Sequence, residues 1–163
     1  GGFLALLRSL APQGKPKILL LGAGGTGQAL VHRLIQEEWE VAVWNRTPGK
    51  WEALLGEETS RTAVLAEISL KGVGILVNAT SSGLVGDPLA IPWEEAEGRL
   101  TAFDLLYGRE TEFLKSARER GIPCADGAVM LMEQGALSFE WWLDRAAPRS
   151  AMLEAIHADP SAH

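Results

Sequence analysis

The chain has little of what marks several protein classes. Its 163 residues hold one cysteine, Cys124, which excludes an internal disulfide and is typical of a reducing compartment. No apolar run is long enough to cross a bilayer, and no charged-then-apolar leader is visible. The three histidines are scattered, so no metal site is expected. We therefore predict a cytoplasmic protein without a metal ion or a membrane contact.

Basic charge is also scarce. The formal charge is −6 and no basic stripe runs along the chain, which argues against a nucleic-acid partner. A small anionic ligand remains compatible, because a few local cations suffice to hold one. With 47% hydrophobic residues, a chain of this length can bury the core of one globular domain.

Short apolar segments alternate with segments of helical spacing. Strands that alternate with helices imply right-handed crossovers. We therefore expect an α/β, Rossmann-like, doubly wound parallel sheet of about six strands, with helices on both faces. No boundary divides the chain, so residues 1–163 are predicted to form a single domain, frayed at 159–163. The pattern predicts strands at 17–21, 41–44, 74–78, 101–105 and 124–126, and helices at 25–38, 48–55 (Pro48 in its first turn), 65–70, 110–120, 130–146 and 150–157.

A glycine-rich turn follows the first predicted strand. Gly22, Gly24 and Gly27 fit the spacing G-x-G-x-x-G between a buried strand and a helix, which indicates a dinucleotide-binding turn. Such glycines permit a tight turn, a close approach of backbone to a diphosphate, and close packing of helix on strand. The alternative is a plain strand–helix turn without a ligand. The residues expected to hold the diphosphate are Gly22, Ala23, Gly24, Gly25 and Thr26.

The residues at the end of the second predicted strand distinguish NAD from NADP. NAD-binding folds place an acidic residue there for the ribose 2′-hydroxyl, whereas this chain has Asn45, followed by Arg46, Thr47 and Lys50. A carboxylate would repel a 2′-phosphate, and these neutral or cationic donors would bind it. We predict NADP rather than NAD as the cofactor. The alternative is that Arg46 and Lys50 are solvated loop cations.

Five sequence blocks in a fixed order resemble shikimate dehydrogenases over nearly the whole chain. The resemblance implies reversible reduction of 3-dehydroshikimate to shikimate by NADPH, on the route to chorismate and the aromatic amino acids. The last block is the most distinctive. The blocks are Gly22–Thr26, Asn45–Lys50, Asn78–Leu84, Asp104–Tyr107 and Asp126–Ala136.

The same resemblance assigns further site residues. Thr80 and Ser81 would lie near the nicotinamide ribose, and Leu105 and Gly127 against the nicotinamide carboxamide. Met130 would also bind the cofactor. Tyr107 and Gln134 would reach shikimate or 3-dehydroshikimate, although a Tyr after a strand is often packed and a Gln on a helix often solvated. The chain departs from the family pattern at Arg109, where a proline is usual, and at Lys50, where arginine is commoner; the latter should weaken bidentate phosphate binding.

The resemblance also implies that the chain holds only the cofactor domain. In this family a Lys and an Asp on a preceding substrate domain perform the proton chemistry, so we expect no catalytic residue here and no activity of the isolated chain. Residues 1–12 and 137–158 would be helices that bridge to that domain, and their apolar side chains would favour self-association. The alternative is that these segments simply cover the sheet. Two alternatives are an NAD-preferring quinate/shikimate dehydrogenase relative and a stand-alone NADP-binding or sensor module.

Overall fold

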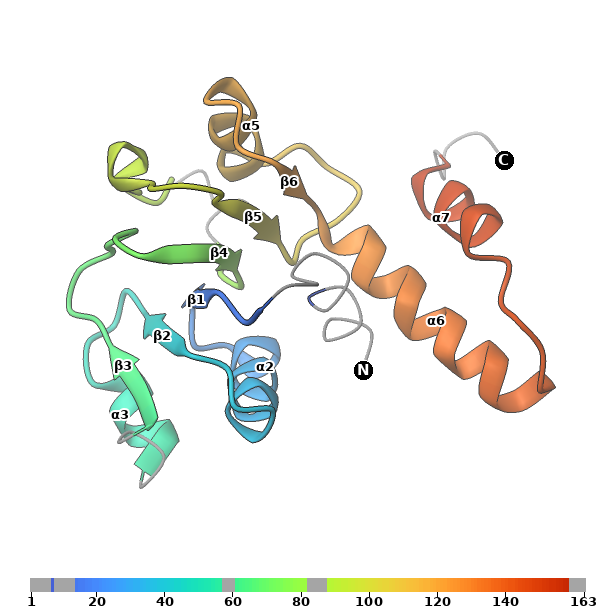
Figure 1. Ribbon diagram of the computed structural model, residues 1–163, viewed down its shortest axis with the longest axis horizontal. Helices are drawn as coiled ribbons and strands as arrows, with labels where there is room; N and C mark the ends of the chain where they lie inside the picture. Colours follow the sequence, from blue (N-terminus) through green and yellow to red (C-terminus); the bar gives the residue numbers. More distant parts are fainter. Residues whose placement is uncertain (1–6, 8–13, 57–60, 82–87, 159–163) are drawn as a thin grey trace.

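A parallel sheet of six strands forms the centre of the molecule (Figure 1). The computed structural model describes residue 7 and residues 14–56, 61–81 and 88–158. All neighbouring strands pair in parallel, in the order β3-β2-β1-β4-β5-β6, which is the order of a doubly wound dinucleotide-binding sheet. The predicted fold class is confirmed. The strands are β1 (Lys17–Leu21), β2 (Val41–Trp44), β3 (Thr62–Val64), β4 (Val73–Asn78), β5 (Thr101–Asp104) and β6 (Cys124–Ala125).

Helices cover both faces of this sheet. Helices α2 and α3 lie on one face and α5 on the other, while α6 and α7 lie side by side beyond β6 (Figure 1). The helical elements are α2 (Gly25–Gln36), α3 (Lys50–Leu55), η2 (Trp93–Glu95), α5 (Glu112–Glu119), α6 (Gly127–Leu143) and α7 (Arg149–His157).

The side chains of β1 divide between two cores. Ile18 and Leu20 pack in a cluster with residues of α2 and α3, and Leu19 and Leu21 pack in a cluster with residues of α5. All four are fully buried. A strand exposes alternate side chains to opposite faces, so a central strand covered on both sides must be apolar throughout. The continuous apolar run of β1 is therefore what this position in the sheet requires.

The predicted helix at residues 65–70 is wrong. These residues form an irregular segment after β3, a strand that the sequence pattern did not reveal. One carboxylate oxygen of Glu95 accepts hydrogen bonds from the Ser69 hydroxyl (2.8 Å) and the Leu70 N–H (3.0 Å). Leu65 and Ile68 pack against the α5-side core. Side-chain hydrogen bonds thus satisfy a segment whose apolar spacing imitates a helix.

Other predicted helix boundaries also differ from the structure, most clearly those of α3 and α6. Pro48 is not in the first turn of a helix, because α3 begins at Lys50 after Gly49, whose φ of 75° is left-handed. The long helix α6 begins three residues earlier than predicted and ends at Leu143 rather than at residue 146. The Asp126 carboxylate caps its start by accepting the Ala128 N–H (3.0 Å).

The pair α6–α7 is joined by one arginine. Arg149 forms ion pairs with Glu133 (3.2 Å) and Glu140 (2.7 Å), both on α6. Residues 1–12 and 159–163, for which helical and frayed structures were predicted, lie outside the described residues except for Leu7, which is fully buried. Within the described part of the chain, no helix is both long enough and apolar enough to span a membrane.

Candidate functional site

The glycine turn between β1 and α2 is packed too closely for larger residues at two positions. A Cβ on Gly22, whose φ is +101°, would lie 2.9 Å from the Ala79 carbonyl oxygen, and a Cβ on Gly27 would lie 2.6 Å from the Gly22 carbonyl oxygen. The turn is held to the neighbouring strand by the Gly22 N–H, which donates to the Trp44 carbonyl (2.8 Å). Gly22 and Gly27 therefore serve the tight turn and the close helix–strand packing that the motif predicts.

The other two glycines face open space. Nothing lies within 4 Å of a Cβ built on Gly24 or Gly25. Gly24 is the N-cap residue of the twelve-residue helix α2, and among the described residues no side chain accepts a hydrogen bond at this helix start. The first N–H groups of the helix therefore have no side-chain partner from Gly24. The exposed Thr26 follows in the first turn. An uncapped helix start with an open approach is a site that suits an anion such as a diphosphate.

Asn45 connects the end of β2 to this turn. Its Oδ1 accepts the Ala23 N–H (3.1 Å), and its Nδ2 donates to the Thr47 carbonyl (3.1 Å). The side chain that the sequence analysis assigned to a 2′-phosphate thus holds the glycine turn in place. Ala23 is buried, and its N–H is already engaged by this contact. The exposed Arg46 and Lys50 follow Asn45 on the same side.

A hollow of about 460 Å³ brings the two segments together. No carboxylate is among the described residues that line it. Trp44 and Leu89, which the sequence analysis did not assign to the site, also line this hollow and an adjoining one. An apolar side chain at the end of a strand, as Trp44 is, or in a loop, as Leu89 is, gives no sequence signal of that role. Thr47 lines a further adjoining hollow. The predicted site residues that share the 460 Å³ hollow are Gly22, Ala23, Gly24, Asn45, Arg46, Lys50, Thr80 and Ser81.

The ends of β4 and β5 are linked by buried polar groups. Asp104 is fully buried, and its Oδ2 accepts hydrogen bonds from Asn78 Nδ2 (3.1 Å) and the Thr111 hydroxyl (2.7 Å). Its Oδ1 accepts the Leu106 N–H (3.1 Å). Asn78 Oδ1 in turn accepts the Thr80 N–H (3.1 Å) and hydroxyl (2.7 Å). Burial raises the pKa of the Asp104 carboxyl, against the opposing effect of its hydrogen bonds.

The start of α6 abuts the end of β5. A Cβ on Gly127 would lie 2.2 Å from the Leu105 carbonyl oxygen, and the Gly127 N–H donates to the Leu106 carbonyl (3.0 Å). Met130 is half-buried and packs against the core beneath α2. The structure therefore brings Leu105 and Gly127 together, as the resemblance implies, at the same edge of the sheet as the glycine turn.

The two predicted substrate residues lie apart from the hollow. Tyr107 is 53% exposed, and Gln134 is exposed on α6. Neither lines the 460 Å³ hollow. In the described ranges no group of three or more His, Cys, Asp or Glu side chains could hold a metal ion.

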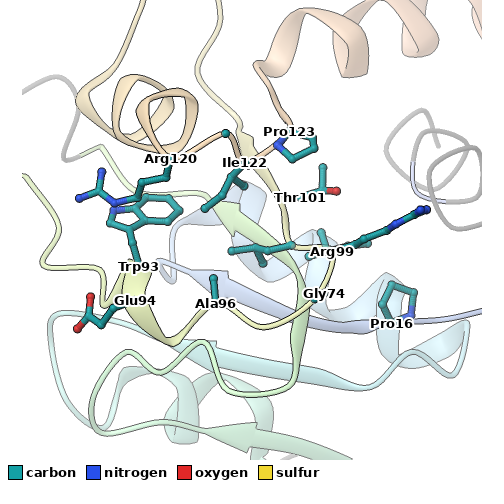
Figure 2. Close-up of a pocket in the computed structure, with 14 residues that line it drawn as sticks. Pro16, Gly74, Trp93, Glu94, Ala96, Arg99, Thr101, Arg120, Ile122 and Pro123 are labelled. Atoms are coloured by element: carbon teal, nitrogen blue, oxygen red, sulfur yellow. The ribbon is translucent and has the colours of Figure 1, made fainter.

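A larger hollow of about 940 Å³ lies at the opposite edge of the sheet (Figure 2). It is lined by Gly74 and Thr101, at the starts of β4 and β5, and by the segment before β6. The Arg120 guanidinium stacks over the Trp93 ring there (5.9 Å) and donates to the Ser116 carbonyl (2.9 Å). Ligands of doubly wound sheets bind at the carboxyl ends of the strands, so the smaller hollow is the candidate site.

The chain is similar to known proteins over most of its length. Residues 6–85 match the family model described as shikimate / quinate 5-dehydrogenase, and residues 127–157 match the shikimate 5′-dehydrogenase C-terminal domain. A shikimate dehydrogenase (NADP(+)) from Thermus thermophilus is 41% identical over 157 residues, which are 94% of this chain and 59% of that protein.

Solved structures give the same result. The shikimate 5-dehydrogenase of another Thermus thermophilus strain, in complex with NADP(H) and shikimate, superposes with a TM-score of 0.77 at 37% identity, over 95% of this chain and 59% of the other. The 5-ketofructose reductase of Gluconobacter sp. strain CHM43 superposes with a TM-score of 0.80 at 30% identity, over 95% and 60%. The chain spans 50–61% of the length of the curated relatives it matches.

Proposed function

The chain belongs to the shikimate dehydrogenase family, and we propose that it is the NADP(H)-binding domain of an enzyme that reversibly reduces 3-dehydroshikimate to shikimate. One observation carries the proposal. The glycine turn and the cations Arg46 and Lys50 line one hollow at the carboxyl edge of the sheet, with no carboxylate among its described lining residues. That combination suits a dinucleotide with an extra phosphate on its adenosine half.

The residues divide between the two halves of the cofactor. The N–H groups at the start of α2 would hold the diphosphate, beside the open backbone of Gly24 and Gly25. Arg46 and Lys50 would hold the 2′-phosphate, while Asn45 keeps the turn in place. Thr80 and Ser81 would lie at the nicotinamide ribose, and Leu105, Gly127 and Met130 beside the nicotinamide. Bound NADPH supplies the hydride.

The proton chemistry belongs, in this proposal, to a substrate domain. The family's catalytic Lys and Asp lie there, and the greater length of the matched relatives accommodates such a domain. Tyr107 and Gln134 would meet the substrate from this chain, which agrees with their exposure. Residues 1–12 and 137–158 would bridge to the substrate domain. In the second range, Trp141 (83% exposed) and Trp142 (73%) present the apolar surface that such an interface would cover.

The assignment of the substrate depends on the family rather than on the hollow. The similarity to a 5-ketofructose reductase means that the same fold accompanies another named substrate. Tyr107 and Gln134 alone do not settle the substrate. Shikimate is favoured because the five blocks resemble shikimate dehydrogenases and the matched relatives include proteins with that name. The cytoplasmic location expected from the single cysteine stays a prediction.

Titration of the chain with NADPH and then NADH, followed by tryptophan fluorescence, tests the cofactor. Trp44 lines the hollow and directly precedes Asn45, so binding should change its emission. Tight binding of NADPH with weak binding of NADH is the expected result. Equal binding would favour the NAD-preferring quinate/shikimate relative, and binding of neither would overturn the proposal.

A second experiment separates the enzyme from a sensor module. The chain is joined to the substrate domain of a Thermus thermophilus relative, and oxidation of shikimate by NADP⁺ is measured. Activity is expected only in the joined protein. A joined protein that binds NADPH but never turns over would favour a binding module without chemistry of its own.

A further inference from the structure

Asp104 is a buried acid to which the proposed function assigns no role. Its side chain is fully buried in the sheet and receives three hydrogen bonds, from Asn78, Leu106 and Thr111. Each of these partners is a donor, which is the set that an ionised carboxylate satisfies. None of the three donors is a cation. Burial of a carboxylate without a cation is costly, and an apolar side chain would avoid that cost.

The donors come from three separate segments. Asn78 ends β4, and Leu106 lies in the loop that follows β5 and carries Tyr107. Thr111 is the N-cap of α5, where its hydroxyl also accepts the Leu114 N–H (3.3 Å). The Leu106 carbonyl accepts the Gly127 N–H, so the start of α6 is attached to the same loop. One carboxylate therefore fixes the relative positions of β4, the 105–111 loop and α5.

The hydrogen-bond network of Asp104 extends to a residue that lines the 460 Å³ hollow. The Asn78 amide donates to Asp104 with Nδ2 and accepts both the N–H and the hydroxyl of Thr80 with Oδ1. These partners leave the amide only one orientation. The Thr80 side chain is thereby held through Asn78, and Thr80 lines the hollow while Asp104 does not.

We propose that Asp104 is a positioning residue for the nicotinamide half of the cofactor, acting through Asn78 on Thr80 and through the Leu106 N–H on the Leu105–Gly127 contact. This inference rests on the proposed function, because that function places Thr80, Leu105 and Gly127 beside the nicotinamide and its ribose. The adenosine half binds at the end of β2, and none of the hydrogen bonds that Asp104 accepts comes from that strand. Loss of the network should therefore affect the two halves unequally.

The test compares two ligands on the Asp104→Asn variant. NADPH occupies both halves of the site, whereas adenosine 2′,5′-bisphosphate carries only the adenosine half with its 2′-phosphate. An amide at position 104 turns an NH₂ group toward at least one of the three donors. We expect NADPH to bind about five- to tenfold more weakly, as for the loss of one hydrogen bond. Adenosine 2′,5′-bisphosphate should bind within about twofold of the unmodified chain.

A spectroscopic reading and a second pair of variants keep the test decisive. Emission of the reduced nicotinamide in the saturated complex should move toward that of free NADPH in Asp104→Asn. Thr111→Val removes one donor to Asp104, and Thr111→Ser retains it. Thr111→Val should reproduce the selective loss of NADPH affinity, and Thr111→Ser should bind NADPH as the unmodified chain does. This pair decides the matter if Asp104→Asn does not fold.

The outcomes separate the inference from the function beneath it. If the unmodified chain binds neither ligand, the proposed function fails, and the inference with it. If it binds both but the variants weaken both ligands alike, or weaken neither, Asp104 has only a general structural role and the inference alone is overturned. Equal affinity of the unmodified chain for the two ligands would also overturn the inference. The nicotinamide half would then add nothing to binding, and Asp104 would have no bound group to position.

Discussion

Replacement of Gly27 by alanine tests whether the glycine turn is built by close packing. The new Cβ would lie 2.6 Å from the Gly22 carbonyl oxygen, 0.4 Å inside the 3.0 Å below which such contacts are essentially never found. Leu20 Cδ2 would be 3.3 Å from the same Cβ. The Gly22 carbonyl is backbone in a turn whose N–H is bonded to Trp44, so it cannot swing aside as a side chain would.

The expected loss of stability follows from two opposing terms. Overpacking of this kind costs about 1–3 kcal/mol. Alanine gains up to about 1 kcal/mol over glycine in a helix interior. Because the contacting atom is backbone, the upper part of the first range, about 2–3 kcal/mol, applies. Less the gain of about 1 kcal/mol, the net fall in the free energy of unfolding should be about 1–2 kcal/mol, or roughly 2–8 °C in Tm for a chain of this size. The displaced turn should also weaken NADPH binding.

Gly25→Ala provides the matched control. It makes the same chemical change two residues earlier in α2, where nothing lies within 4 Å of the new Cβ. Urea and thermal unfolding, followed by tryptophan fluorescence, should show Gly25→Ala to be as stable as the unmodified chain or more stable. The packing argument would be refuted by a Gly27→Ala variant of undiminished stability, or by an equal loss in both variants.

Four further outcomes are expected. Arg46→Ala should weaken NADPH binding roughly ten- to a hundredfold and leave NADH unchanged in fluorescence titrations, since one charge-assisted contact is lost; equal losses would contradict the 2′-phosphate assignment. Because burial raises the pKa of Asp104 above 3.8, the folded state holds this proton more tightly than the unfolded chain. The stability of the unmodified chain relative to Asp104→Asn should therefore rise as pH falls through the raised pKa toward 3.8 in urea titrations, and a flat difference would contradict the shift. Arg149→Ala removes the ion pairs between α6 and α7, so amide exchange in α7 should accelerate while β1 stays protected. Trp141→Lys combined with Trp142→Lys should reduce self-association in sedimentation velocity, unless these exposed rings play no part in it.

Strands that are buried on both faces could be predicted from the sequence, whereas of the two edge strands the pattern indicated β6, at residues 124–126, but not β3. The limits of β1 and β2 are as predicted, because a central parallel strand needs an unbroken apolar run. β3 has only three residues at the edge of the sheet and was missed. The apolar spacing of residues 65–70 was then mistaken for a helix, although the contact that shapes this segment comes from Glu95. Local periodicity carries no information about such a distant partner.

The candidate site divides in the same way. The glycine turn could be predicted because the backbone geometry of one strand–helix unit requires glycine at these positions. The network around Asp104 joins positions 78, 104, 106 and 111 across two strands and a helix, and only the fold reveals that they meet. The sequence signal was weak: single polar residues where apolar strands end, at Asn78 and Asp104, inside blocks that the family resemblance had already marked.

Asn45 has a structural role that the sequence analysis did not foresee. The sequence analysis took its amide as a donor to a 2′-phosphate; in the structure Oδ1 accepts the Ala23 N–H and one N–H of Nδ2 donates to the Thr47 carbonyl. An aspartate could accept the same Ala23 N–H, yet it would bring a negative charge to the hollow that Arg46 and Lys50 line. The value of the amide is therefore that it keeps the turn in register without that charge. In the proposed function, the charge that attracts the 2′-phosphate comes from these two cations.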